Sequence, residues 1–388
     1  MENTRHMKMT PVGLIPEDWV VATIKDYGHL LSDGINPQQY REKDFVEYSM
    51  PAYDDGQSPT KCKGADMNSN RTHIKGEVLL FNKLNVRQKR VWYIENAPSN
   101  ALCSMEFLAY SSDKVDLRLL REILLQDSVT KGFESVSRGT SNSQKRITPS
   151  DFLNFSFALP PLAEQHRIAD ALSGVDDMVG ALDVAIAKKR LIKEGLMQQL
   201  LTGKTRLPGF SGKWKESTLG QLVDICKGVQ FDSDLFSENG RYPMLNGGIT
   251  PSGYSEFFNA EADTITISEG GNSCGYVNYM TEKFWCGGHC YSLKVKSVDK
   301  LFLYQLLKFN EKDIMALRVG SGLPNVQSKS LIDFRLYFSE DEREQKSISN
   351  ILKKADDEIA SLESQRDKYT LIKQGMMQEL LTGKTRLI

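Results

Sequence analysis

Two stretches of the chain carry apolar residues at alternating spacings of four and three positions, the pattern of a helix with one narrow apolar stripe. The first set is Ile168, Leu172, Val175, Val179, Leu182 and Ile186, and the second is Ile348, Leu352, Ala355, Ile359 and Leu362. This spacing is typical of a coiled-coil seam, which a lone helix could not bury. The pattern therefore predicts two long helices that pair with each other. The alternative is two separate helices, each lying on its own domain.

Both predicted helices end in nearly the same sequence. LIKEGLMQQLLTGKTRL at 191–207 returns as LIKQGMMQELLTGKTRL at 371–387, an offset of 180 residues with 14 of 17 positions identical. The apolar stripe continues at Ile192, Leu196 and Leu200 and, in the second copy, at Ile372, Met376 and Leu380. Gly203 and Gly383 stand where a left-handed cap would end each helix. About 40 helical residues make a rod of about 60 Å. The repeat indicates that the same helical element occurs twice in the chain.

Short alternating apolar runs before each helix predict strands. They are VLLF at 78–81, VWYI at 91–94, TITI at 264–267 and YSLKV at 291–295, and short helices are predicted at 117–126 and 301–310. Trp19 and Trp214 take the same place in the two copies. However, the first lies 145 residues before Glu164 and the second 130 before Glu344, so the two domains are unlike.

We therefore predict an α+β fold in which two mixed α/β domains are joined by two helices that pair as an antiparallel coiled coil. The first domain spans 1–157, the first helical spacer 158–205, the second domain 206–337 and the second spacer 338–388. With antiparallel helices, the chain would close into a pseudo-twofold circular arrangement. Two unlike ligand readers at a set distance could meet one face of duplex DNA at two sites.

Composition narrows the class of protein. The 388 residues include 49 basic and 50 acidic side chains, so any nucleic-acid binding must come from local patches. Six cysteines in so long a chain do not form a disulfide framework. No signal peptide and no run of about 18 apolar residues is present. We therefore expect a soluble, cytoplasmic protein with no membrane partner.

The helix motifs resemble those of a known family. LPPLAEQHRIADAL at the start of the first helix, LLTGKTRLPGFSGKW at its exit and the final LLTGKTRL are similar to the DNA specificity subunit of type I restriction-modification systems. One departure is FSEDEREQ at 338–345, which lacks the prolines of ALPPLAEQ at 158–165. The resemblance implies two target recognition domains, each reading half of a bipartite sequence in double-stranded DNA, and helical spacers that dock two modification (methyltransferase) subunits.

The same resemblance implies a chain without chemistry or cofactors of its own. S-adenosylmethionine, ATP and Mg would belong to the partners: the modification subunits methylate adenine, and restriction (motor-nuclease) subunits join through the complex. Missing motifs agree. The Asn/Asp-Pro-Pro-aromatic signature of an amino-methyltransferase is absent, and the GKT at 203–205 has Gln198 where a phosphate loop needs glycine. Cys286-Gly-Gly-His289-Cys290 lacks the second ligand pair of a zinc site, which favours core thiols.

Candidate DNA-binding residues lie in four stretches that combine basic, amide and small side chains, which suit phosphates and base edges. They are Lys83, Asn85, Arg87, Lys89 and Arg90; Arg138, Gly139, Thr140, Ser141 and Lys145; Asn246, Gly247 and Gly248; and Arg318, Gly320, Ser321, Gly322 and Asn325. The alternative for each is an ordinary solvated turn. Four cations of the first helix are expected to face DNA phosphates, acidic partner surfaces or solvent: Lys188, Lys189, Arg190 and Lys193.

The near-identity of the two helix ends predicts a docking surface used twice. The candidate interface residues are Leu196, Leu200, Leu201 and Thr202 in the first copy and Met376, Leu380, Leu381 and Thr382 in the second. Together with the family resemblance, the sequence predicts a non-catalytic DNA-recognition subunit. The alternatives are a stand-alone methyltransferase or nuclease with degenerate motifs, and a coiled-coil scaffold that touches no DNA.

Overall fold

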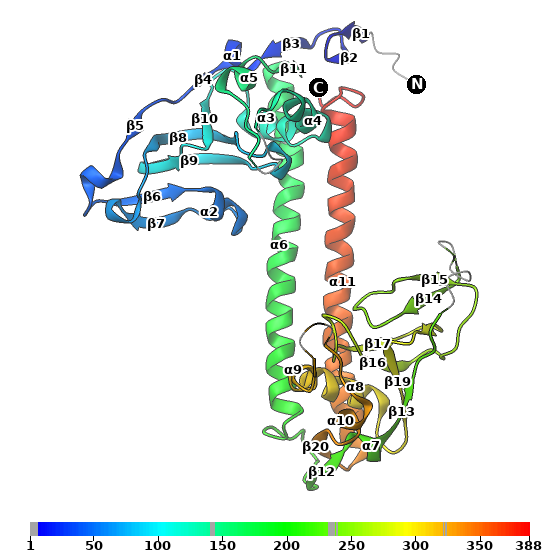
Figure 1. Cartoon of the computed structure of the whole chain (residues 1–388). Coiled ribbons are helices and arrows are strands. Elements are labelled where there is room, and N and C mark those ends of the chain that lie inside the picture. Colours follow the sequence, from blue (N-terminus) through cyan, green and yellow to red (C-terminus); the bar gives the residue numbers. More distant parts are fainter. Residues whose placement is uncertain (1–6, 140–143, 232–236, 238–239, 321, 323) are drawn as a thin grey trace. The chain divides into compact units, whose positions relative to one another are not determined.

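The computed structural model describes residues 7–139, 144–231, 237, 240–320, 322 and 324–388, and it divides into two compact units (Figure 1). Unit 1 consists of Met1–Ala181 and Arg366–Ile388, and unit 2 of Leu182–Gln365. In the described part of the chain, no helix combines the length and the apolar character that a bilayer crossing requires.

Two long helices, α6 (Leu162–Leu200) and α11 (Glu342–Leu380), each span 39 residues at the predicted offset. The Pro161 carbonyl accepts a hydrogen bond from the Gln165 amide at the start of α6, and the Asp341 carbonyl accepts one from Gln345 in α11. The Asp341 carboxylate also accepts from the Arg343 amide at 2.9 Å, so a side-chain cap stands where the first copy has prolines. Gly203 and Gly383 have φ of 70° and 69°, which confirms the left-handed caps.

Each unit contains an antiparallel pairing of these helices. In unit 1, Lys373 contacts Asp176 at 2.7 Å, and in unit 2, Lys193 contacts Asp356 at 2.5 Å. These are equivalent pairs under the offset of 180. The seam is confirmed: its residues are buried or half-buried, with Ile168, Leu172, Ile186, Ile348, Leu352 and Ile359 buried. The alternative of two unpaired helices is therefore wrong.

Charged residues beside the seam also pair between the helices. Lys189 contacts Glu358 at 2.6 Å and Arg190 contacts Glu363 at 2.5 Å, both within unit 2. Lys189 and Lys193 therefore form ion pairs with the chain's own carboxylates. The stripe also turns outward earlier than expected, since Ile192 and Ile372 are 47% and 40% exposed.

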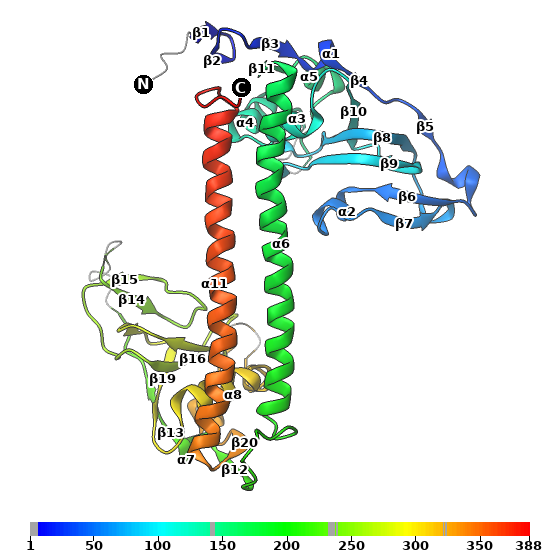
Figure 2. The same cartoon turned by 180° about the vertical axis from the view of Figure 1, so that it is seen from behind.

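Unit 1 is built on a seven-stranded sheet of order β4-β10-β8-β9-β6-β7, with β5 beside β8 (Figures 1 and 2). Its elements are β1 (Met7–Thr10), β2 (Gly13–Pro16), β3 (Val20–Thr23), α1 (Ile24–Tyr27), β4 (His29–Leu30), β5 (Gly34–Ile35), η1 (Pro37–Tyr40), β6 (Asp44–Tyr48), α2 (Met50–Asp54), β7 (Thr60–Lys63), η2 (Gly64–Asp66), β8 (Arg71–Asn82), η3 (Val86–Gln88), β9 (Val91–Ser104), β10 (Phe107–Ser111), α3 (Leu117–Leu124), α4 (Asp127–Val136), α5 (Pro149–Leu153) and β11 (Ser156–Leu159).

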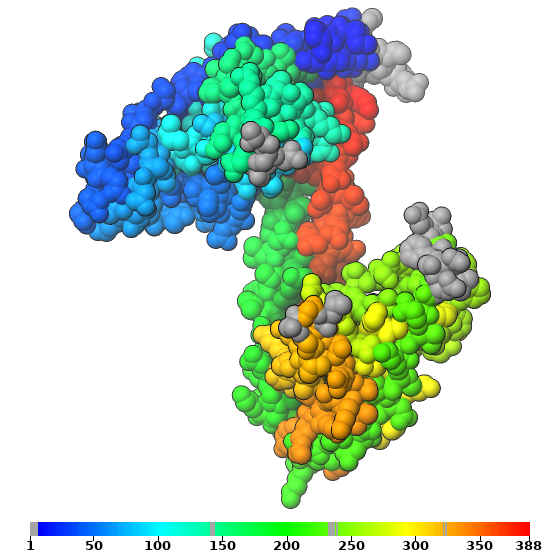
Figure 3. All heavy atoms as spheres, in the orientation of Figure 1, coloured from blue at the N-terminus to red at the C-terminus, as the bar shows by residue number. Residues whose placement is uncertain are grey.

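The run VLLF reads as continuously apolar because β8 is covered on both faces. Leu79 and Phe81 join the core formed with α3 to α5, while Val78 and Leu80 join a second cluster with β6 and α2. In the space-filling view, the cyan-to-green atoms of this part of unit 1 lie between the blue atoms of the N-terminal strands and the red C-terminal helix (Figure 3). The predicted strands at 78–81 and 91–94 lie within β8 and β9, and the predicted helix at 117–126 corresponds to α3.

Unit 2 repeats the central part of this architecture, which we call the shared frame. Its elements are β12 (Trp214–Thr218), α7 (Leu219–Leu222), β13 (Val223–Lys227), β14 (Tyr242–Leu245), β15 (Gly253–Ser255), β16 (Thr264–Ser268), β17 (Val277–Met280), β18 (Trp285–Cys286), β19 (Cys290–Val295), α8 (Lys300–Phe309), α9 (Glu311–Ala316), α10 (Ser328–Ile332) and β20 (Arg335–Ser339). The antiparallel order β13-β19-β16-β17 matches β4-β10-β8-β9 of unit 1. β12 pairs with β20 as β3 pairs with β11.

The two units differ in what is added to the shared frame. Unit 1 extends its sheet by β6, which runs parallel to β9, and by β7. Unit 2 instead carries a separate three-stranded sheet of order β15-β14-β18. The common frame explains why the helix motifs recur, and these additions lie in the parts of the two copies that have diverged in sequence.

Candidate nucleic-acid interface

In unit 1, two sequence-predicted stretches lie side by side. The loop from Lys83 to Arg90 joins β8 to β9, and the segment around Arg146 precedes α5. Leu84 forms a β-bridge with Arg146, and the Asn85 amide donates to the Lys145 carbonyl at 2.8 Å. We call these two stretches the unit 1 loop pair. The predicted residues Thr140 and Ser141 lie outside the described residues.

Three cations of the loop that joins β8 to β9 are neutralised by nearby carboxylates. Arg87 pairs with Glu134, Lys89 with Asp127 at 2.5 Å, and Arg90 with Asp54 at 2.7 Å. Hydrogen bonds from these partners lower the pKa of Glu134, Asp127 and Asp54 below the ordinary carboxyl value, so all three stay ionised at neutral pH. The loop is therefore less positive than its sequence indicates.

Four further cations complete the loop pair, and one of them, Arg146, contacts Glu106 at 3.1 Å. Among the residues that the structure describes, Lys83, Arg138 and Lys145 make no ion pair, and Gly139 has a φ of 147° beside them. A Cβ at Gly139 would lie 2.9 Å from the Gln144 carbonyl oxygen, so only glycine allows the backbone at 139 to approach the backbone at 144 this closely.

Removing the carboxylates should expose the cations they hold. We expect Asp127→Asn with Glu134→Gln to raise the affinity of the full chain for non-specific duplex several-fold at low salt. Two freed cations would steepen the slope of log K against log salt by up to about 1.8. The measurement is fluorescence anisotropy over a salt series. The matched control is Glu95→Gln with Asp113→Asn, which changes net charge equally in unit 1 without releasing a cation. Equal slopes for both double variants would contradict the prediction.

In unit 2, the equivalent loops also meet. Gly270, which follows β16, forms a β-bridge with Asn325, and the Val326 amide donates to the Glu269 carbonyl at 2.8 Å. These contacts repeat the Leu84–Arg146 bridge and the bond from the Ile147 amide to the Lys83 carbonyl in unit 1. Arg318, Gly320 and Gly322 belong to the same segment, whereas Ser321 lies outside the described residues.

A third predicted stretch, 246–248, joins this cluster. The Ser273 hydroxyl donates to the Gly247 carbonyl at 2.6 Å, and the Asn246 side chain accepts from the His289 amide at 3.2 Å. Gly247 has a φ of 82°, and a Cβ there would lie 2.6 Å from the His289 carbonyl oxygen. Gly248 follows in the same turn. The unit 2 loop cluster is thus formed, among the described residues, by 246–248, 269–273, 287–289, 318–320, 322 and 324–325.

The two clusters differ in chemistry. Glu269 occupies the place that Lys83 has in unit 1, and its carboxylate accepts from the Tyr291 hydroxyl at 2.9 Å and from Lys227 at 2.7 Å. Cys286 and Cys290 are buried with Leu245, Met280 and Phe284, which agrees with core thiols. In the described part of the chain, no group of three or more His, Cys, Asp or Glu side chains is placed to bind a metal.

The predicted interface residues lie mostly inside the chain. Leu200 and Leu201 are buried in the core of unit 2, and Leu380 and Leu381 in that of unit 1. Leu196 and Met376 are half-buried against the same cores, and the hydroxyls of Thr202 and Thr382 donate to Gln198 and Gln378 carbonyls of their own helices. Such burial leaves the four leucines in contact with the chain itself, not with a free surface.

The shared sequence LLTGKTRL instead forms a joint that is built once in each unit. In unit 1, Arg386 donates to Glu164 at 2.6 Å and lies 5.6 Å from the centre of the Trp19 ring, whose indole donates to Glu164 at 3.0 Å. In unit 2, Arg206 donates to Glu344 at 2.7 Å and lies 5.9 Å from the Trp214 ring. The C-terminal segment therefore packs on the N-terminal segment in unit 1, as the circular arrangement predicts.

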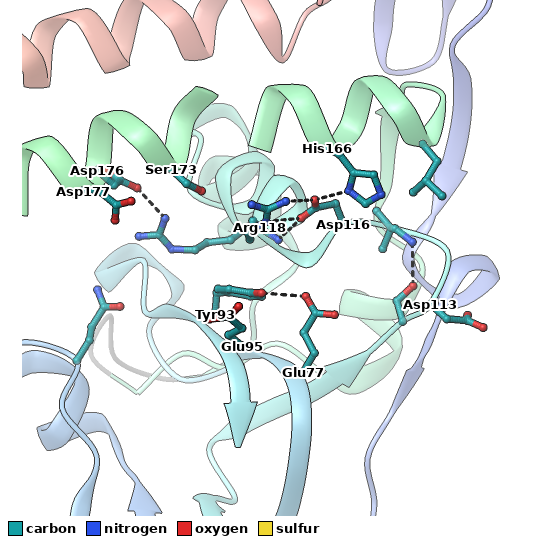
Figure 4. A pocket seen from close by; sticks show the side chains of 15 residues that line it. Glu77, Tyr93, Glu95, Asp113, Asp116, Arg118, His166, Ser173, Asp176 and Asp177 are labelled. Carbon is teal, nitrogen blue, oxygen red and sulfur yellow. Dashed lines mark hydrogen bonds and ion pairs between the residues drawn. The ribbon is translucent and has the colours of Figure 1, made fainter. Parts of the chain in front are cut away.

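A polar cavity of about 880 Å³ between the sheet and α6 in unit 1 was not anticipated (Figure 4). Arg118 and His166 both contact Asp116, at 2.7 Å and 2.8 Å. Although burial opposes ionisation, these hydrogen bonds keep the pKa of Asp116 below its usual value. Six carboxyl groups line this cavity: Glu77, Glu95, Asp113, Asp116, Asp176 and Asp177. The two arginines of the lining, Arg118 and Arg121, already pair with carboxylates, so the cavity is unsuited to phosphate. No local motif marks it in the sequence.

Comparison with known proteins supports the resemblance. A putative type I specificity subunit of Mycoplasma genitalium is 32% identical over 154 residues, which is 39% of this chain and 40% of that protein. The chain thus matches about two fifths of the length of this relative, and 41% of a second from Mycoplasma pneumoniae. A putative type I restriction enzyme specificity subunit of Methanocaldococcus jannaschii is 25% identical over 98% of this chain and 97% of its own length.

The fold is also similar to a solved structure. The crystal structure of the type I restriction-modification S subunit from M. genitalium superposes with a TM-score of 0.72 at 20% identity, covering 97% of this chain and 98% of that one. The sequence profile of the type I restriction modification DNA specificity domain matches twice, at residues 16–186 and 211–369. Because these matches cover most of both copies, the chain belongs to the family of the type I restriction modification DNA specificity domain.

Proposed function

We propose that this chain is the non-catalytic DNA-recognition subunit of a type I restriction-modification complex. Residues 1–157 and 206–337 act as its two target recognition domains, and each reads one half of a bipartite sequence in double-stranded DNA. The observation that carries the proposal is the meeting of the predicted polar stretches at equivalent places on one frame, with Lys83 in one cluster and Glu269 in the other. Unlike clusters on a shared frame suit the reading of two unlike half-sites.

The paired helices are proposed to set the gap between the half-sites and to dock two modification subunits. Support for docking comes from an apolar pair that recurs in both copies, Leu191–Ile192 and Leu371–Ile372, of which both leucines are about two-thirds exposed or more. Two identical subunits require the same surface twice. Restriction subunits join through that complex, and S-adenosylmethionine, ATP and Mg serve the partners.

A domain exchange tests whether each recognition domain reads its own half-site. When residues 1–157 are replaced by the corresponding domain of a relative with a different target, we expect only one half of the methylated sequence to change. The readout is methylation mapping of DNA from cells that express the complex. A change in both halves would refute the assignment of one domain to one half-site. Methyl transfer from labelled S-adenosylmethionine by the purified chain alone would instead favour a stand-alone methyltransferase.

A further inference from the structure

A hollow of about 340 Å³ opens in unit 1 between α2 and the loop that joins β8 to β9. Tyr53 of α2 donates its hydroxyl to the Lys89 carbonyl at 3.2 Å, which ties the two walls together. The hollow is lined by Met50, Pro51, Asp54, Leu84, Asn85, Gln88 and Arg90. Three of these side chains are apolar, two carry neutral amides and two are charged.

The backbone around the hollow is held in an unusual conformation. Asn85 and Lys89, which flank η3, have φ of 51° and 50°, the left-handed region that non-glycine residues rarely adopt. The Asn85 amide is fixed by the Lys145 carbonyl at 2.8 Å, and its carbonyl accepts from the Gln88 amide at 3.0 Å. Strained turns of this kind persist where the surrounding structure enforces them, and they cluster at ligand sites.

The charged and neutral polar groups of the hollow differ in availability. Arg90 donates through Nε and Nη2 to both carboxylate oxygens of Asp54, at 2.8 Å and 2.7 Å, so this pair is largely satisfied internally. By contrast, the side-chain amides of Asn85 and Gln88 have no hydrogen-bond partner within the described residues. The free donors and acceptors of the hollow are therefore amides.

We propose that this hollow reads one A·T base pair through the major groove, an inference that rests on the proposed function. An amide offers the donor and acceptor that the N7 and N6 edge of adenine requires, and an apolar wall suits the thymine methyl group. Gln88 and Asn85 supply the amides, and Met50, Pro51 and Leu84 supply the wall. Arg90 and Asp54 would match a G·C pair, but each already satisfies the other, so they act as positioning residues that shape the hollow.

The test uses the full-length chain assembled with the modification subunits of its own system and a randomised duplex library, from which bound sequences are read. We expect Gln88→Ala, and likewise Asn85→Ala, to reduce preference for adenine at one and the same position of one half-site by about 5- to 150-fold. The other half-site should keep its preferences. Replacing thymine by uracil at that base pair removes the methyl group and should weaken binding by the wild type.

The matched control is Gln39→Ala, which truncates an exposed glutamine of η1 that does not line the hollow. Circular dichroism establishes that each variant is folded. An even loss of preference at all positions, no loss, or a loss confined to a G·C pair would overturn the proposal. A wild type without any sequence preference would refute the proposed function itself, whereas a selective wild type with an unaltered Gln88→Ala variant would refute only the A·T site.

Discussion

Replacing Arg386 by alanine is expected to destabilise unit 1 by about 3–5 kcal/mol, because it leaves a buried carboxylate without its cation. The side chains of Arg386 and Glu164 are 7% and 4% exposed, and Arg386 also holds Asp18 at 2.5 Å. Arg386 and Trp19 lie near opposite ends of the sequence. This ion cluster and the packing around it therefore hold the C-terminal segment on the N-terminal one. The free energy of unfolding is measured by urea denaturation followed by circular dichroism.

An exposed pair of the same chemistry supplies the control. Arg335 and Glu216 are 71% and 55% exposed, so Arg335→Ala should cost less than about 1 kcal/mol. Arg206→Ala should destabilise unit 2 by less than Arg386→Ala destabilises unit 1, because the Arg206 side chain is 26% exposed. In addition, Arg206 and Trp214 are close in sequence, so the chain itself keeps them near each other. If Arg386→Ala proved no more costly than Arg335→Ala, the joint would not hold the segments.

The helices and central strands were predictable from the sequence because their signals are local. The alternation of four and three positions placed both helices and their seam, and VLLF and TITI each marked a strand that lies inside the sheet. The ion pairs were not predictable in the same way. Lys189 and Glu358 are separated by 169 residues, and spacing alone gives no means to choose between an internal carboxylate, a phosphate and a partner.

The candidate site shows the same limit. Glycine, amide and basic residues identified the loops that meet in each unit, but the sequence did not show that Asp54, Asp127 and Glu134 neutralise the basic loop, since they come from α2 and α4. The helix ends were interpreted as an outer surface because they are nearly identical. The matching positions of Trp19 and Trp214, and of Glu164 and Glu344, were a signal in the sequence for an internal joint built twice.

Because the buried joint accounts for LLTGKTRL, the proposed docking surface is assigned to repeated residues that remain exposed. Leu191 is 70% exposed and Leu371 67%, and each is followed by an isoleucine that is at least 40% exposed. A leucine at this exposure contributes little to the fold of its own chain, so stability alone does not account for its presence at both positions. The pair therefore fits contact with two copies of one partner.

Changing Leu191 and Leu371 together to aspartate is expected to weaken capture of the modification subunits by more than about 100-fold, because a charge would be buried at both contacts. The change in the free energy of unfolding should stay within about 1 kcal/mol, since both positions are exposed. Each single variant should retain one subunit, which native mass spectrometry of the assembled complex would count. Val184→Asp is the matched control: Val184 is also 70% exposed on α6, but its counterpart in the repeat is Ser364. Capture of two subunits by the double variant would place the docking surface elsewhere on the helices, whereas equal loss in Val184→Asp would show that any added charge on α6 is sufficient.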